Sequence, residues 1–127
     1  MDNKQFGETL EKRTELFSVA VIKMTNTFPQ SDEARILKNQ VIRSATSIGA
    51  NYREANRAKS PSDFKYKIRL CEGEASETNY WLSIIGRMNW LENKSIQQNL
   101  NESREILAIF TKINQSMRSK ELAKARR

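Results

Sequence analysis

Three glutamates close together in the sequence are the first residues whose spacing could do chemistry. Glu72, Glu74 and Glu77 fall on one predicted helix, and carboxylate oxygens are the ligands that Mg²⁺ prefers in proteins. Lys67 and Arg69 lie a turn or two away on the same helix, as expected of a solvated face whose charges balance. We therefore interpret the glutamates as surface residues and predict neither a metal site nor a cofactor.

The chain contains no histidine, which excludes most other kinds of catalytic site. Histidine is the usual general base, the commonest metal ligand and the partner that activates a serine or cysteine nucleophile. The single cysteine, Cys71, stands at an apolar position between Ile68 and Ala75, which is typical of a small core residue. The sequence therefore predicts a protein without catalytic residues or an evident small-molecule substrate; an enzyme would have to rely on the three glutamates alone.

Positive charge is the strongest functional signal in the sequence. The formal net charge is +7, and basic side chains dominate the segment from residue 35 to residue 69, where Arg53 and Arg57 lie one helical turn apart. Lysine and arginine bind phosphates without reading the bases, which favours RNA or DNA as the partner, with little sequence specificity, over an ordinary soluble basic surface. The predicted nucleic-acid-binding residues are Arg35, Lys38, Arg53, Arg57, Lys59, Lys65 and Arg69.

Apolar residues recur every three or four positions along four segments, which predicts an all-α chain. Breaks at Pro29, at Ser60–Pro61 and between residues 89 and 93 separate four helices at about residues 8–28, 33–58, 61–89 and 95–118. Residues 119–127 are basic and predicted to form a flexible tail. Short connections make neighbouring helices antiparallel, so we expect one domain, an up-down-up-down four-helix bundle.

The segment from Gln40 to Glu54 is unusual because its inward face carries small and polar residues. Ser44, Ala45 and Gly49 allow a neighbouring helix to approach closely, whereas buried polar groups near them need hydrogen-bond partners. The sequence thus predicts close packing between this helix and its neighbours.

Arg43 and Glu77 are predicted to pair across the second and third helices. Each lies seventeen residues from Ser60, near the centre of the connecting turn, so antiparallel helices place them at the same level. If both side chains enter the seam between the helices, pairing offsets the cost of burying their charges, and loss of one partner costs about 3–5 kcal/mol.

Several observations bear on location. The only cysteine has no disulfide partner in the chain, and the first fifteen residues include no apolar stretch typical of a signal peptide. No apolar run approaches the roughly 20 residues needed to span a bilayer. We therefore expect a cytoplasmic protein that does not insert into membranes.

The second helix carries a distinctive set of residues: Arg43-Ser44-Ala45, Ser47-Ile48, Ala50-Asn51 and Glu54. This set resembles a signature of the bacterial four-helix-bundle proteins encoded by intervening sequences in 23S ribosomal RNA genes. The resemblance continues into the third helix at Phe64, Ile68, Gly73 and Glu77, and the chain departs from the family pattern at Ala55, Cys71 and Glu74.

That family is in turn similar to the accessory proteins of diversity-generating retroelements, which are basic pentameric bundles that bind nucleic acid and partner a reverse transcriptase. The resemblance implies a homopentamer, a nucleic-acid role and a possible reverse-transcriptase partner. The alternative is a structural bundle that docks a protein through Tyr80, Trp81 and Trp90. A further set of apolar residues lies partly outside the apolar faces of the predicted helices. These residues could belong either to a broad core or to a subunit interface: Leu16, Ile22, Ile42, Tyr80, Trp81 and Trp90.

Overall fold

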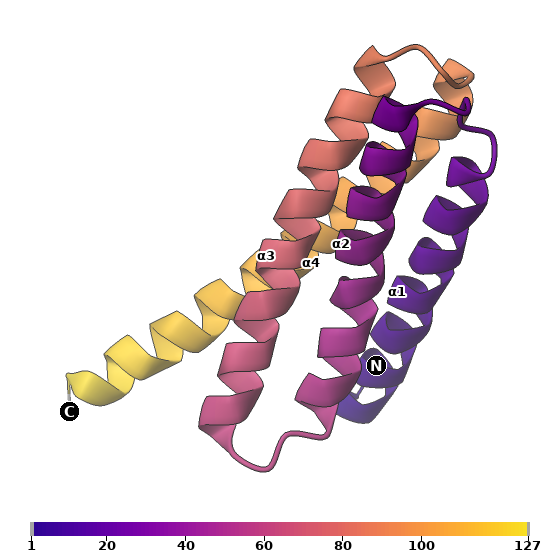
Figure 1. Ribbon diagram of the computed structural model, residues 1–127. Helices are drawn as coiled ribbons and strands as arrows, with labels where there is room; N and C mark the ends of the chain where they lie inside the picture. The colour runs from indigo at the N-terminus through magenta and orange to yellow at the C-terminus, as the bar shows by residue number, and fades with distance from the viewer. Residues whose placement is uncertain (1, 127) are drawn as a thin grey trace.

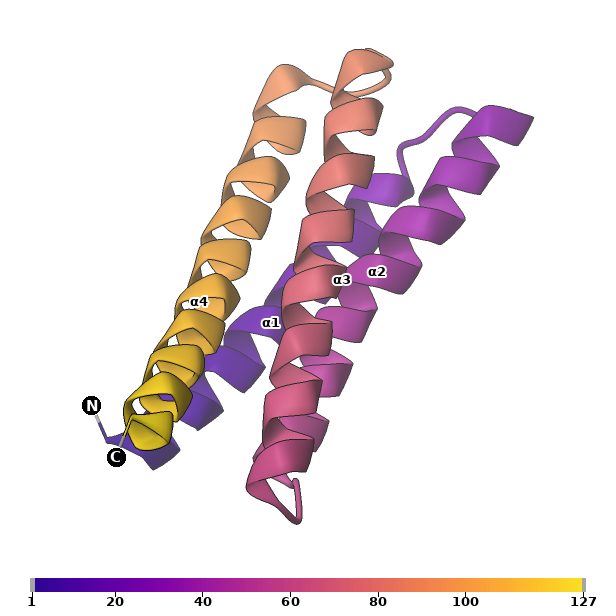
Figure 2. The ribbon, with the colours of Figure 1, turned by 90° about the vertical axis from the view of Figure 1, so that its left-hand side faces the viewer.

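The computed structural model describes residues 2–126 and contains four helices that alternate in direction (Figure 1). They are α1 (Asn3–Thr25), α2 (Asp32–Asn56), α3 (Pro61–Arg87) and α4 (Asn93–Ala125). α2 packs against α1 and α3, and α4 packs against α3 and, over a shorter length, against α1. The two hairpins therefore form an up-down-up-down bundle, and the predicted all-α four-helix fold is confirmed (Figure 2).

Local signals in the sequence set the helix ends. The Ser31 and Ser60 side chains accept hydrogen bonds from the Ala34 and Asp63 backbone N–H groups at 3.2 and 3.1 Å, and so cap α2 and α3. Pro61 occupies the first turn of α3, where its missing N–H removes no helical bond. Beyond the end of α3, Asn89 adopts φ 58°, the left-handed conformation that asparagine tolerates best after glycine.

Two helix ends differ from the sequence prediction by more than three residues. α1 begins at Asn3, because Asp2 and Gln5 form a reciprocal capping box, rather than at about residue 8. α4 continues to Ala125, past the predicted end at residue 118. Its last turns contain leucine, alanine, lysine and glutamate, all strong helix formers, so the described part of the predicted tail is helical. Residue 127 lies outside the described residues.

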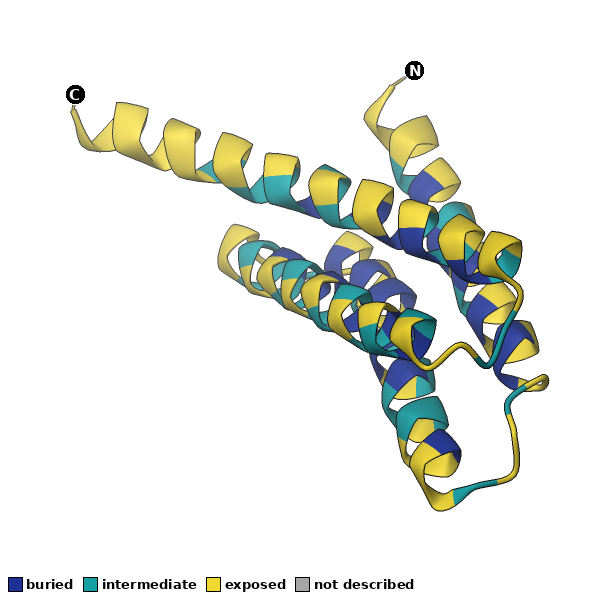
Figure 3. Cartoon of the chain, turned by 90° about the horizontal axis from the view of Figure 1, so that it is seen from above, coloured by how far each residue is buried: buried dark blue, intermediate teal, exposed yellow. Residues whose placement is uncertain are grey.

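The core fills the space between the four helices, as the buried inward faces in Figure 3 show. Phe110 of α4 is fully buried and meets the ring of Tyr52 of α2 edge-on, with centroids 5.4 Å apart. Between α1 and α4, Arg13 donates two hydrogen bonds to the Glu102 carboxylate at 2.7 and 2.8 Å. The bonds from Arg13 hold the pKa of Glu102 below its usual value, so this pair contributes stability that is lost as pH falls through the lowered pKa.

The small residues of α2 bring α1 and α2 close together. A methyl group at Gly49 would lie 3.0 Å from the Thr14 hydroxyl and 3.3 Å from the Thr14 Cβ. Thr14 is fully buried, and its hydroxyl already donates to the carbonyl of Leu10 or Glu11. The Thr14 side chain therefore has little freedom to move away.

We expect Gly49→Ala to lower the free energy of unfolding by about 1 kcal/mol, because overpacking outweighs the gain in helix propensity. Gly86→Ala is the matched control, since its methyl group would meet only Ile96 Cγ1 at an ordinary 3.4 Å. That variant should gain about 0.5–1 kcal/mol. Urea melts of both proteins check the prediction, and equal shifts of the two variants would contradict it.

No helix within residues 2–126 combines the length and the apolar character that crossing a membrane requires.

Candidate nucleic-acid interface

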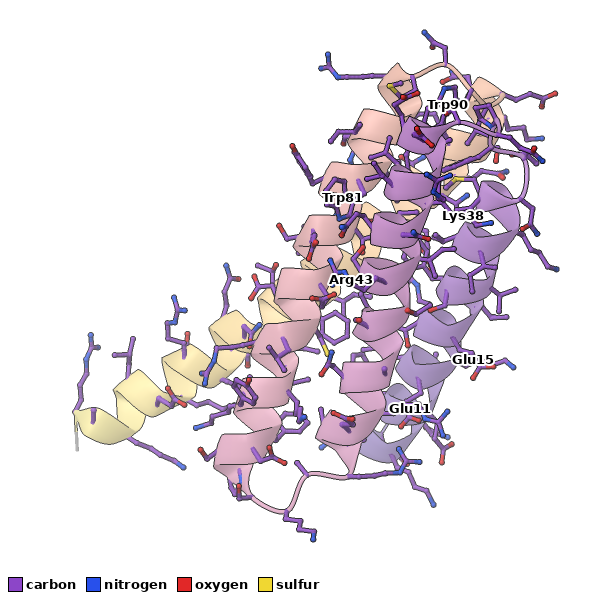
Figure 4. All side chains as sticks on the ribbon, viewed as in Figure 1. Glu11, Glu15, Lys38, Arg43, Trp81 and Trp90 are labelled. Carbon is purple, nitrogen blue, oxygen red and sulfur yellow. The ribbon has the colours of Figure 1, made fainter. Side chains whose placement is uncertain are left out.

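Basic side chains from three helices meet at one end of the bundle. The C-terminal end of α2 and the N-terminal end of α3 lie at the end of the bundle that carries Glu11, while Lys38 and Trp90 lie toward the opposite end (Figure 4). The last turns of α4 project away from the bundle beside the start of α3, where Glu121 contacts Lys65. We call this group of cations the basic end. It contains Arg53, Arg57, Lys59, Lys65, Arg69 and Arg118.

Arg53 and Arg57 share one carboxylate at the basic end. Their guanidinium groups lie 3.8 and 3.9 Å from Oε1 of Glu11, and both side chains are exposed. Arg57 also donates to the backbone carbonyl of Arg53 at 3.0 Å, which holds the two side chains on one side of α2. Long, exposed ion pairs contribute little, so two charges against one carboxylate leave net positive charge facing solvent.

The second group of cations spans α3 and α4. Lys65, Arg69 and Arg118 line a small hollow of about 80 Å³ together with the carboxylates of Glu72 and Glu121. Lys65 forms an ion pair with Glu121. The hydrogen bond from Lys65 lowers the pKa of Glu121, which keeps that carboxylate ionised. Arg118, at the predicted end of the fourth helix, was not among the predicted nucleic-acid-binding residues; the packing of α4 on α3 brings it beside Lys65 and Arg69.

The turn between α2 and α3 connects the two groups. Lys59 in this turn is exposed and has no ion-pair partner within residues 2–126. Lys67, by contrast, donates to Glu54 across the hairpin at 2.7 Å, and this bond raises the pKa of Lys67. The six cations of the basic end therefore lie near three carboxylates, those of Glu11, Glu72 and Glu121, whereas Lys67 is already paired.

The structure does not bring Arg35 and Lys38 to the basic end. Lys38 precedes Arg53 by fifteen residues of α2, which is ~22 Å along the helix axis. Arg35 donates to Asp32 at 2.7 Å near the other end of the bundle. The nucleic-acid-binding residues predicted between residues 35 and 69 therefore do not form one surface, because a helical hairpin of that length reaches both ends of the bundle.

Arg43 and Glu77 do meet between α2 and α3. The Arg43 guanidinium donates to Glu77 and, at 3.3 Å, to Glu74, while the Trp81 indole N–H donates to Glu77 at 3.1 Å. The pair lies at the surface, however: the side chains of Arg43 and Glu77 are 48% and 35% exposed. Solvent screening makes the cost of breaking such a pair far smaller than that of a buried one.

A double-mutant cycle of Arg43→Met and Glu77→Met should give a coupling energy below about 1 kcal/mol. Each charge retains contact with water after its partner is removed, so neither single change leaves a buried charge. Thermal melts of both single variants and the double variant measure the coupling. A coupling of about 3 kcal/mol or more would mean that the pair is effectively desolvated.

The three glutamates of α3 do not converge. Glu72 accepts hydrogen bonds from Thr111 and Asn114 of α4 at 2.9 and 2.6 Å, whereas Glu74 and Glu77 turn to Arg43 on α2. Within residues 2–126 no three Cys, Asp or Glu side chains gather as a metal site requires.

Cys71 is fully buried next to the Ile48 carbonyl. Burial in apolar surroundings raises the pKa of its thiol to about 12, so the reactive thiolate form is scarce near neutral pH. This position agrees with the core role predicted from the sequence.

Residues 9–112 match the 23S rRNA-intervening sequence protein family. The chain belongs to this family. A crystal structure from Bacteroides thetaiotaomicron VPI-5482, of a protein of unknown function in the S23 ribosomal protein family, is 31% identical. The similarity covers 82% of this chain and 96% of that chain with a TM-score of 0.75. None of the curated proteins matches the chain.

Proposed function

We propose that this family member is a non-enzymatic cytoplasmic protein that binds RNA or DNA through phosphate contacts at the basic end. The observation that carries the proposal is the grouping of six cations from three helices near only three carboxylates. Cations at such a surface displace the counterions condensed on a nucleic acid, which provides affinity without base recognition.

Assembly into a homopentamer, as the family resemblance implies, would strengthen the proposal. Such a particle would carry five basic ends and a correspondingly larger positive field. Several weak phosphate sites on one particle would also bind one long nucleic acid with high avidity.

The narrower form of the proposal is an accessory role to a reverse transcriptase. A reverse-transcriptase gene with a template repeat beside this gene would support that role. A location inside a ribosomal RNA gene would instead favour a function tied to the intervening sequence.

Salt dependence tests nucleic-acid binding directly. Labelled single-stranded RNA and double-stranded DNA of unrelated sequence should both bind, as measured by fluorescence anisotropy. If all six cations contact phosphates, affinity should fall by about 10³-fold between about 50 and 200 mM salt. Binding that barely changes over this range would contradict phosphate-dominated recognition.

The competing function is a protein-interaction bundle, and one observation favours it. Tyr80 is 60% exposed and stacks edge-on with Trp81, with ring centroids 5.2 Å apart. Exposed aromatic pairs are typical of protein docking sites. Trp90 is less suitable, because it is half-buried against Phe28 at 5.3 Å. Apolar docking at Tyr80 should resist moderate salt, which separates the two functions in the same titration.

A further inference from the structure

A cleft opens between α3 and α4 where the last turns of α4 leave the bundle (Figure 1). Two neighbouring hollows form it: one of about 80 Å³ beside Asn114 and Met117, and one of about 460 Å³ beside the first residues of α3. Lys65, Arg69 and Glu121 line both hollows. We call the two hollows together the α3–α4 cleft.

Cations outnumber carboxylates in the α3–α4 cleft. Arg118 joins Lys65 and Arg69 there, and Glu72 joins Glu121. Both oxygens of Glu72 already accept hydrogen bonds from side chains of α4, at 2.9 and 2.6 Å. Arg69 and Arg118 are exposed and have no ion-pair partner within residues 2–126. Their charges are therefore available to an anion that enters from solvent.

The Glu121 carboxylate occupies the position in the cleft that best suits an anion. It forms an ion pair with Lys65. Its pKa is lowered first by the hydrogen bond from Lys65 and further by the charges of Arg69 and Arg118, so all three cations act on one position. A phosphate oxygen placed there would meet the same three cations.

Little besides the ion pair with Lys65 holds Glu121 in the cleft. Its side chain is 51% exposed, and every residue from 118 to 126 is exposed. An exposed ion pair between two flexible side chains is weak and is screened by salt. A nucleic acid that is already bound to other cations of the basic end presents its phosphates at high effective concentration. It can therefore displace a single carboxylate while the packed part of α4 stays on α3.

The size of the cleft distinguishes single strands from duplexes. A double helix carries its phosphates on the outside of a stiff rod whose major groove alone is about 12 Å wide. A duplex can touch the cations at the rim, but it cannot place a phosphate between α3 and α4. A single strand bends at each nucleotide and can do so. Proteins that bind single strands without sequence preference use a positively charged groove that follows the backbone.

We infer that the α3–α4 cleft takes one strand of single-stranded RNA or DNA, with a phosphate on Lys65 in place of the Glu121 carboxylate. The inference rests on the proposed function, because it assigns one part of the basic end to single strands. Arg53 and Arg57 are exposed on the surface of α2 and would contact single strands and duplexes alike. The basic end thus combines a surface that any nucleic acid reaches with a cleft that only a single strand enters.

Affinities for a short labelled oligonucleotide and for its duplex test the inference. Arg69→Glu combined with Arg118→Glu should lower affinity for the single strand by about 100-fold at low salt, because two phosphate contacts are lost. The duplex should lose less than about 10-fold. Arg53→Glu combined with Arg57→Glu is the comparison and should weaken both probes to the same extent. Equal losses for the two probes in the cleft variant, or no loss for the single strand, would overturn the inference.

Lys120→Glu combined with Lys124→Glu is the matched control on α4. It makes the same change of charge, but neither residue lines the cleft. Affinity for either probe should change by less than about 10-fold. A loss confined to the duplex would mean that the end of α4 enters the major groove, which admits a helix, and would overturn the inference.

Glu121→Gln tests the displacement of the carboxylate without adding a charge. The amide releases Lys65, so affinity for the single strand should rise by about 3-fold, whereas Glu92→Gln, an exposed change of the same kind, should leave it unchanged. An unchanged affinity of the Glu121 variant would contradict the exchange. Wild-type protein that binds neither probe would overturn the proposed function together with the inference. If it binds both with a steep salt dependence, the proposed function stands and the cleft variant decides the inference alone.

Discussion

Phe110→Ala should lower the free energy of unfolding by about 3–5 kcal/mol. Phe110 is fully buried in the centre of α4, and its ring packs edge-on against Tyr52 of α2. Truncation removes the buried ring and leaves a cavity that the packed helices around it cannot fully close. Chemical denaturation followed by circular dichroism measures the loss.

Leu122→Ala is the control on the same helix, since Leu122 is 56% exposed beyond the last ion pair between α3 and α4. This change should cost less than about 0.5 kcal/mol. A large loss at Leu122 would mean that the end of α4 packs against another molecule. Both variants should be measured at several protein concentrations, because a change in assembly would otherwise enter the apparent stability.

The order and type of the helices could be predicted because strong local signals agree with the apolar periodicity. Ser31, Ser60 and Pro61 mark helix starts by mechanisms that act within a few residues. The C-terminal end of α4 has no such signal. Its residues favour helix but add little to the core, so the fading of the apolar pattern was a poor guide to where the helix ends.

Counting residues from the turn at Ser60 predicted the position of the Arg43–Glu77 contact along the helices but not the burial of its side chains. Equal distances from Ser60 predicted the correct level along the two helices. The depth of a side chain depends on its rotation about each helix axis and on its rotamer, and these place the pair at the surface rather than in the seam.

The basic end could be predicted only in part. Arg53, Arg57, Lys59, Lys65 and Arg69 are close in both sequence and space because they flank one turn. Arg118 is about fifty residues from Arg69 in the sequence and joins it through the packing of α4 on α3. Arg35 and Lys38 belong to the same sequence segment but lie toward the other end of α2, a separation that the composition of a segment does not reveal.

The distance between the basic end and the pair Arg35 and Lys38 allows a direct test of nucleic-acid binding. Arg53→Glu combined with Arg57→Glu should lower affinity for unrelated RNA and DNA by about 100-fold at low salt, because two phosphate contacts are replaced by repulsion. The salt dependence should weaken by about one unit of slope for each lost contact. Both side chains are exposed, so helicity and oligomer size should be unchanged.

Arg35→Glu combined with Lys38→Glu changes the net charge by the same amount at the other end of the bundle. If phosphates bind at the basic end, this control should retain affinity within about 10-fold, since charges beyond a Debye length are largely screened. Equal losses in the two double variants would show that net charge alone drives binding. Loss for one nucleic-acid sequence only would indicate base recognition, which an interface made of phosphate contacts does not provide.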